Sequence, residues 1–170
     1  SRMVDPTDRT TCVLFGDGAG AAVFELAENV PFAVTLGARG SEAIRAGGPA
    51  ACDTAPITMD GKAVFRFAVE AMPRCLQAVL DRSQKTLSDL DWVVCHQANS
   101  RIIDHCIKHL HAESSKFYKN MDRHGNTSAA SIPVALNELA EAGKLTPGQR
   151  VACIGFGGGL TWGGMILTYK

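Results

Sequence analysis

The hydrophobic pattern of the chain changes at Gly61, and this change constrains the fold most. Short apolar and β-branched runs at 11–15, 21–26 and about 32–38 precede it and are typical of strands. From Gly61 onward, apolar residues follow a helical spacing for about 20 residues, which predicts an amphipathic helix. An Asp-Gly pair at 17–18 lies between the first two runs, so we expect a β-hairpin there.

The rest of the chain alternates between helix and strand patterns. We expect strands at 92–95 and near 117–118, helices near 99–110 and at roughly 129–142, and two final strands at 150–156 and 160–169. This order predicts an α/β fold in which helices cover a mixed sheet whose last two strands are antiparallel. The long loop at 40–56 has a length that is often functional. No repeat or linker divides the chain, so one domain is expected.

Composition disfavours several classes of function. Seventeen Lys and Arg balance seventeen Asp and Glu, so no net field favours nucleic acid or anionic lipid. No apolar run reaches the roughly 18–20 residues that span a bilayer, and we find no signal peptide, so a cytoplasmic protein is expected. The six cysteines form no CxxC pair, which favours reduced, buried thiols over disulfides or zinc; they are Cys12, Cys52, Cys75, Cys95, Cys106 and Cys153.

His96 directly follows the apolar strand at 92–95, and polar groups converge at the carboxyl ends of such strands. It is a candidate catalytic residue, with a partly exposed loop histidine as the alternative. Neighbouring Cys95 points to the opposite face of the strand, so it does not act as a nucleophile paired with His96. His105 and His109 lie one helical turn apart, but without a third ligand a solvated helix end is favoured over a metal site.

Two segments rich in small residues are further candidates. In 125–133, Asn126 would present a neutral amide donor, unless the segment only caps a helix that starts near Pro133. In 155–159, four glycines between two strands would expose backbone N–H groups, as an oxyanion hole requires, with a tight hairpin as the alternative. The GxGxxA pattern at 16–21 precedes a strand-like run rather than a helix, which disfavours dinucleotide binding.

Five motifs, in the same order along the chain, resemble β-ketoacyl-acyl-carrier-protein synthase III. They are DRTTCVLFGDGAGA (8–21), MDGKAVF (59–65), HQANSRII (96–103), GNTSAASIP (125–133) and GFGGGLTWG (155–163). The resemblance implies that residues 1–170 form the C-terminal half of a thiolase-like fold: a mixed five-stranded sheet with covering helices, one half of a layered αβαβα core. The loop-like first residues agree, and we expect the N-terminal half, with the nucleophilic cysteine, to be absent from this chain.

The resemblance also implies a reaction. An acyl-CoA primer, acetyl-CoA in particular, condenses with malonyl-acyl carrier protein and so starts type II fatty acid biosynthesis. His96 and Asn126 would donate hydrogen bonds to the enolate oxygen, and the backbone N–H of Gly158 would hold the tetrahedral oxyanion. No cofactor and no metal is implied, because the coenzyme A thioester is a substrate.

Binding roles follow from the same motifs. The pantetheine tunnel would be formed by Gly61, Lys62, Phe65, Ala98 and Asn99, with Lys62 where the family often has Asn. A basic patch of Arg101, Arg66 and Lys62 would receive acyl carrier protein, although Arg66 also lies one turn from Glu70. A homodimer is expected. The alternatives are a condensing enzyme of secondary metabolism with another acyl primer, and a non-catalytic fragment that binds carrier protein or dimerises.

Overall fold

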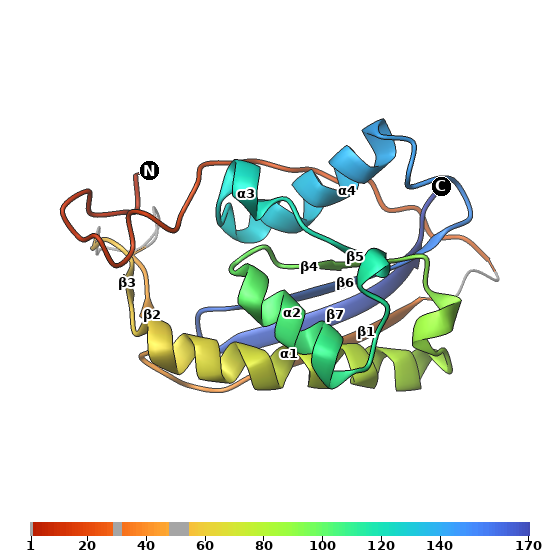
Figure 1. Ribbon diagram of the computed structural model, residues 1–170, viewed down its shortest axis with the longest axis horizontal. Coiled ribbons are helices and arrows are strands. Elements are labelled where there is room, and N and C mark those ends of the chain that lie inside the picture. The colour runs from red at the N-terminus through yellow and green to blue at the C-terminus, as the bar shows by residue number, and fades with distance from the viewer. Residues whose placement is uncertain (1, 29–31, 48–54) are drawn as a thin grey trace.

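The computed structural model of the chain describes residues 2–28, 32–47 and 55–170. A five-stranded sheet in the order β1-β7-β6-β4-β5 forms its centre (Figure 1). The strands are β1 (Ala33–Ala38), β4 (Trp92–Cys95), β5 (Phe117–Tyr118), β6 (Arg150–Gly157) and β7 (Thr161–Thr168). β7 is antiparallel to β1 and β6, whereas β4 is parallel to β5 and β6. The predicted mixed sheet and its antiparallel final pair are confirmed.

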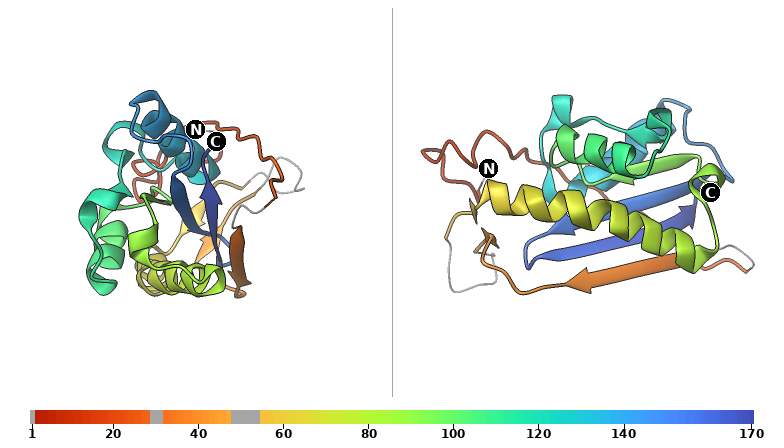
Figure 2. Two further views of the ribbon diagram at one scale, coloured as in Figure 1. Left: turned by 90° about the vertical axis from the view of Figure 1, so that its right-hand side faces the viewer. Right: turned by 60° about the horizontal axis from the view of Figure 1, so that its bottom comes forward.

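Helices cover both faces of this sheet, as two further views show (Figure 2). The long helix α1 (Gly61–Ser83) and α2 (Ser100–His109) pack on one face, and α4 (Ser131–Glu141) packs on the other. Strand periodicity explains the division, because successive side chains of a strand point to opposite faces. In β4, Val93 and Cys95 join the core under α1 and α2, whereas Val94 joins the core under α4.

Helix α1 begins where the sequence predicts, because Asp60 caps it. The Asp60 carboxylate accepts the backbone N–H groups of Lys62 and Ala63, both at 3.0 Å. Its apolar stripe is almost fully buried and includes Met72, Leu76, Val79 and Leu80. Burial of this stripe, rather than helical propensity alone, stabilises so long a helix against the sheet.

Several short elements were not predicted from the sequence. They are the helix α3 (Met121–His124), the paired strands β2 (Ile44–Arg45) and β3 (Thr58–Met59), and single 3₁₀ turns at Leu87–Asp89, Ser114–Lys116 and Ser128–Ala130. Each is too short for a hydrophobic period to show. Of the long loop expected at 40–56, residues 48–54 lie outside the described residues, and Cys52 lies among them.

The β-hairpin expected at 11–26 is wrong. Residues 11–14 form turns, and 16–27 contain no strand; the nearest approach to one is an isolated parallel bridge between Phe15 and Asn126. The glycines here allow close approach rather than a reverse turn. A Cβ on Gly16 would lie 2.2 Å from the carbonyl oxygen of His124, and one on Gly20 would lie 2.4 Å from Cβ of Pro133. The segment therefore lies against the start of α4.

Four of the five described cysteines are buried and unpaired, as predicted: Cys75, Cys95, Cys106 and Cys153. Burial raises the pKa of Cys75 to about 11 and the pKa of Cys106 and of Cys153 to about 12. These thiols therefore stay protonated at neutral pH and pack as small apolar groups. Within the described residues, no helix is both long and apolar enough to cross a membrane.

Candidate active site

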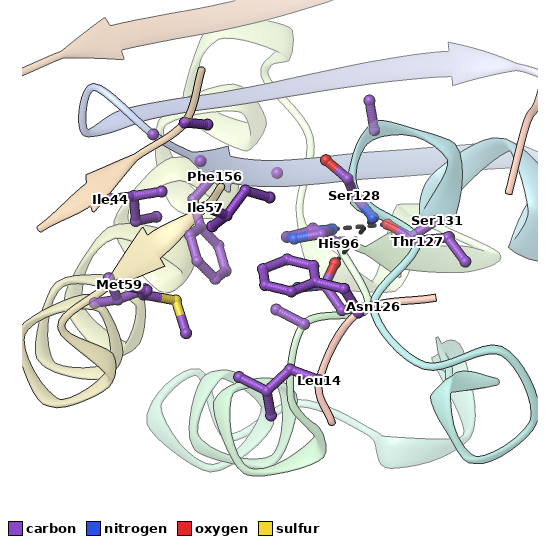
Figure 3. Close-up of a pocket in the computed structure, with 18 of the residues that line it drawn as sticks. Leu14, Ile44, Ile57, Met59, His96, Asn126, Thr127, Ser128, Ser131 and Phe156 are labelled. Atoms are coloured by element: carbon purple, nitrogen blue, oxygen red, sulfur yellow. Dashed lines mark hydrogen bonds between the residues drawn. The ribbon is translucent and has the colours of Figure 1, made fainter. Parts of the chain in front are cut away.

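A cavity of about 1250 Å³ lies where the turn after β4, the turn between β6 and β7 and the turn before α4 meet (Figure 3). These three turns are far apart in the sequence and carry His96, Gly158 and Asn126, which all line the cavity. Apolar side chains form much of the wall, including Leu14, Ile44, Ile57, Met59 and Phe156. A few polar groups thus converge inside a largely apolar pocket, as binding sites for small molecules usually require.

The His96 ring is held from two sides. Its backbone N–H donates to the carbonyl oxygen of Ile154 (2.7 Å), which extends the β4–β6 pairing by one residue. The imidazole lies edge-on to Phe156, with ring centroids 5.3 Å apart. Burial lowers the pKa of His96 to about 4, so the ring is neutral at pH 7.

Ser131, the first residue of α4, contacts one nitrogen of the His96 ring. Its Oγ lies 2.7 Å from Nδ1 of His96 and accepts the backbone N–H of Gln97 at 3.3 Å. When this hydroxyl donates its proton to Nδ1, the ring proton is on Nε2. Nε2 lies on the side of the ring away from Ser131, toward the cavity (Figure 3).

Asn126 is fixed through its backbone and its side-chain oxygen. Its N–H donates to the carbonyl oxygen of Leu14, and its own carbonyl oxygen accepts from Gly16, both at 3.0 Å. Its Oδ1 accepts the backbone N–H of Ser128 at 2.9 Å. Because Oδ1 is used internally, the Nδ2 amide is the group left to donate to a ligand. No side chain caps α4 itself, whereas Oδ1 of Asn126 binds the first N–H of the 3₁₀ turn Ser128–Ala130 that leads into it.

The glycine-rich segment 155–159 forms the end of β6 and the start of the turn to β7. Gly158 lies between the two strands, and its carbonyl oxygen accepts a hydrogen bond from the Thr161 hydroxyl at 3.0 Å. Within the described residues, its N–H has no acceptor, so it is available to a ligand in the cavity. The turn is therefore both part of a hairpin and part of the cavity wall.

The predicted binding residues divide into two groups. Gly61, Phe65, Ala98 and Asn99 line the cavity, and Asn99 also caps α2 by accepting the backbone N–H of Arg101 at 2.9 Å. The basic residues Lys62, Arg66 and Arg101 are exposed and lie outside the lining. The structure therefore does not bring Lys62 into the cavity. Arg66 and Glu70 form no ion pair within the described part of the chain.

Some residues of the site were missed in the sequence. Ser131 belongs to the small-residue segment 125–133, so a signal was present but its contact with His96 was not predictable. Gln97 is buried beside His96 and was noted only as part of a turn. Met3 and Val4 line the cavity without any local signal, because only the tertiary fold brings them there.

The histidines of α2 form no evident metal site. The rings of His105 and His109 stack with centroids 6.0 Å apart. Within residues 2–28, 32–47 and 55–170, no group of three or more His, Cys, Asp or Glu side chains is arranged to hold a metal ion.

Comparison with known proteins connects the fold and cavity with one family. The model of the 3-oxoacyl-[acyl-carrier-protein] synthase III C-terminal domain matches residues 80–169, and the 3-oxoacyl-[acyl-carrier-protein] synthase III model matches residues 1–40. A β-ketoacyl-[acyl-carrier-protein] synthase III of Clostridium botulinum is 40% identical over 183 aligned residues, which cover all of this chain and 56% of the relative.

Solved structures give the same result. The 3-oxoacyl-[acyl-carrier-protein] synthase III of Aquifex aeolicus superimposes with a TM-score of 0.89 at 39% identity, over 98% of this chain and 54% of that one. The priming β-ketosynthase of a polyketide biosynthetic pathway superimposes with a TM-score of 0.90 at 32% identity, over 99% of this chain and 54% of that one.

The fold places the chain among proteins with the thiolase-like fold. Within that class, it belongs to the 3-oxoacyl-acyl-carrier-protein synthase III family. The chain spans about half the length of the curated relatives that it matches.

Proposed function

We propose that this chain is the C-terminal half of a β-ketoacyl-acyl-carrier-protein synthase III. The enzyme would condense an acyl-CoA primer, acetyl-CoA in particular, with malonyl-acyl carrier protein and so start type II fatty acid synthesis. One observation carries the proposal: His96, Asn126 and the N–H of Gly158, from three distant turns, line a single cavity. A carrier-binding or dimerising fragment without catalysis would need none of these groups together.

The acyl-accepting thiol would come from an N-terminal half. No described cysteine lines the cavity, and the raised pKa values of Cys75, Cys106 and Cys153 make these thiols poor nucleophiles. The exposed apolar side chains of Val23, Phe24, Leu26 and Leu36 further support a packing partner outside the described residues.

In the proposed mechanism, the thiolate of that half takes the acyl group from coenzyme A. Loss of CO₂ from the malonyl thioester then leaves the bonding electrons as an enolate, with negative charge on the thioester oxygen. Nε2–H of His96 and Nδ2–H of Asn126 donate to this oxygen. The enolate carbon attacks the acyl thioester, the Gly158 N–H stabilises the tetrahedral oxyanion, and the thiolate leaves as this intermediate collapses.

The neutrality of both side-chain donors suits this chemistry. An imidazole with a pKa of about 4 donates from Nε2 without bringing a positive charge that would bind the substrate carboxylate before CO₂ leaves. Asn126 donates at any pH. Both therefore act most strongly where charge develops in the transition state, which is the requirement for catalysis by differential stabilisation.

Asn126→Ala in the full-length synthase tests the proposal. We expect decarboxylation of the malonyl thioester to slow about 10²–10³-fold, as when one oxyanion donor is lost, with primer binding unchanged. The matched control is Asn137→Ala, which removes an exposed asparagine from α4 and leaves both steps unchanged. Equal losses in decarboxylation and primer binding would assign Asn126 a structural role and overturn the proposal. The 170-residue chain alone is expected to show no condensation.

Partners follow from the same assignment. Arg101, with Lys62 and Arg66, would receive the acidic carrier protein, and Arg101→Glu should weaken that binding at low salt more than the exposed control Arg74→Glu. Wild-type affinity in Arg101→Glu would remove this patch from the interface. The homodimer and the cytoplasmic location stay predictions; light scattering and cell fractionation of the full-length protein test them, and a monomer or a membrane-bound protein contradicts them.

A second candidate keeps the chemistry and changes the primer. The TM-score of 0.90 with the priming β-ketosynthase of a polyketide pathway favours it, because that relative matches as well as the synthases do. A primer profile of the full-length enzyme discriminates the two. A clear preference for acetyl-CoA supports the first candidate, and a preference for longer or modified acyl groups supports the second.

A further inference from the structure

A second polar cluster lies outside the lining of the cavity and is centred on Glu138 of α4. Its Oε2 accepts hydrogen bonds from Asn120 (2.7 Å), Arg123 (2.9 Å) and the Tyr118 hydroxyl (3.2 Å). Its Oε1 lies 2.6 Å from Nε2 of His124. Four partners on one carboxylate, which is only 22% exposed, exceed what an ordinary surface ion pair gathers. The mechanism proposed above uses none of these groups.

The partners of Glu138 bracket α3. Asn120 directly precedes this helix, and His124 is its last residue. The helix has only four residues and no side-chain cap, so it is not stable by itself. By binding both of its ends, Glu138 ties α3 to α4. Gly125 and Asn126 follow at once, so the carboxylate fixes the segment that brings Asn126 to the cavity.

The cluster also reaches the turn that carries His96. Gln97, which is 1% exposed, accepts the backbone N–H of Asn120 at 3.1 Å and donates to the carbonyl oxygens of Cys95 (2.7 Å) and Tyr118 (3.1 Å). Asn120 therefore binds Gln97 through its backbone and Glu138 through its side chain. A continuous polar chain joins the residue after His96 to the helix before Asn126.

We propose that Glu138 is a positioning residue for Asn126. Glu138 does not line the cavity, and it acts through α3 by holding the Asn126 carboxamide where the enolate oxygen forms. This inference rests on the proposed function, because it assigns Glu138 a part in that reaction. Partial burial by itself would raise the pKa of Glu138. The hydrogen bonds from His124, Asn120, Arg123 and Tyr118 outweigh it and lower the pKa to about 2, so the carboxylate is ionised at neutral pH.

Three variants of the full-length synthase test the rate effect. Glu138→Ala should slow decarboxylation about 10–100-fold, as a displacement of about 1 Å does, with the KM for the primer unchanged. Glu138→Gln keeps an acceptor oxygen for Asn120 and Arg123 and should stay within about 5-fold of wild type. Glu141→Ala removes an exposed carboxylate from the same helix and is the matched control, with no expected change. A Glu138→Ala enzyme as fast as the control overturns the proposal.

A double variant separates positioning from general damage to the fold. If Glu138 acts only through Asn126, Glu138→Ala has no further effect on decarboxylation once Asn126→Ala is present, so the two effects are not additive. A full second loss of about 10–100-fold in the double variant would show that Glu138 acts elsewhere, and this overturns the inference. Should Glu138→Ala fail to fold, Glu138→Asp, which withdraws the carboxylate by one methylene, replaces it with the same expected pattern.

Hydrogen exchange distinguishes failure of this inference from failure of the proposed function. Glu138→Ala should raise amide exchange at 121–128 and leave β6 and β7 protected. Unchanged exchange at 121–128 would contradict the positioning role of Glu138, whatever the decarboxylation rates of the variants are. Faster exchange at 121–128 would support Glu138 as the anchor of this segment. If the Asn126→Ala enzyme then decarboxylates at the wild-type rate, the catalytic role of Asn126 is rejected.

Discussion

Residues 61–170 and residues 2–28 differ in how far their apolar side chains are buried. In the first region, strands and helices bury one another, and Leu76, Val93 and Ile154 are completely inaccessible to solvent. In the second, Val23 and Leu26 are fully exposed, although the local pattern there looked equally strand-like. The comparison shows that an apolar, β-branched sequence is only a preference for the strand conformation. A strand forms where a neighbouring backbone can hydrogen-bond to it.

The largest expected effect contrasts two leucines. Leu76→Ala should lower the free energy of unfolding by about 2–5 kcal/mol, because it opens a cavity between α1 and the sheet. Leu26→Ala should change it by less than about 0.5 kcal/mol, because that side chain is 101% exposed. Urea denaturation of the two variants measures both values.

Similar losses at the two positions would erase the distinction between the regions. In the full-length enzyme, the same Leu26→Ala change should become destabilising, because we propose that the N-terminal half covers this side chain. A neutral effect there as well would count against that packing.

The next effect tests the point where the N-terminal segment contacts the core. Gly16→Ala would place a Cβ 2.2 Å from the carbonyl oxygen of His124, and overpacking of this kind costs about 1–3 kcal/mol. The control is Gly40→Ala, where no heavy atom lies within 4 Å of the added Cβ. Thermal denaturation compares the two. If Gly16→Ala is as neutral as Gly40→Ala, the segment is not anchored against the turn before α4.

The third effect is a change of stability with pH that depends on His96, a residue of the region 61–170. The pKa of His96 is lowered by burial from 6.5 to about 4, so the unfolded chain binds the proton more readily. The stability that depends on a neutral His96 is therefore complete above pH 6.5 and is lost as pH falls toward 4. The ring-proton resonance of His96 should titrate with a midpoint near 4. A midpoint near 6.5 would mean that the ring is solvated.

The sequence predicted the elements whose periods are long enough to read. Three such predictions are confirmed: the helix from Gly61, the strand before His96 and the final antiparallel pair. These elements form as predicted because each is stabilised by packing within this chain. The hairpin at 11–26 failed because its glycines serve contact with His124 and Pro133, a tertiary fact that no local pattern reports.

The site also contains residues that the local sequence identifies and residues that only tertiary contacts reveal. His96, Asn126 and Gly158 were found as residue types after strands or in small-residue turns, and the structure brings them to one cavity. Their roles remain predictions. Ser131 and Glu138 were not identified from the sequence, because their contacts are with residues far along the chain. Ser131 contacts His96, 35 positions away, and Glu138 contacts His124, 14 positions away.

The bridge between Phe15 and Asn126 has a consequence for how the protein is made. It joins two segments far apart in the chain, and both backbone hydrogen bonds of Asn126 depend on it. A nascent polypeptide emerging from the ribosome exposes residue 15 long before residue 126 exists. The Asn126 carboxamide therefore gains its final orientation only after residue 126 has been synthesised and has folded back against Leu14 and Gly16.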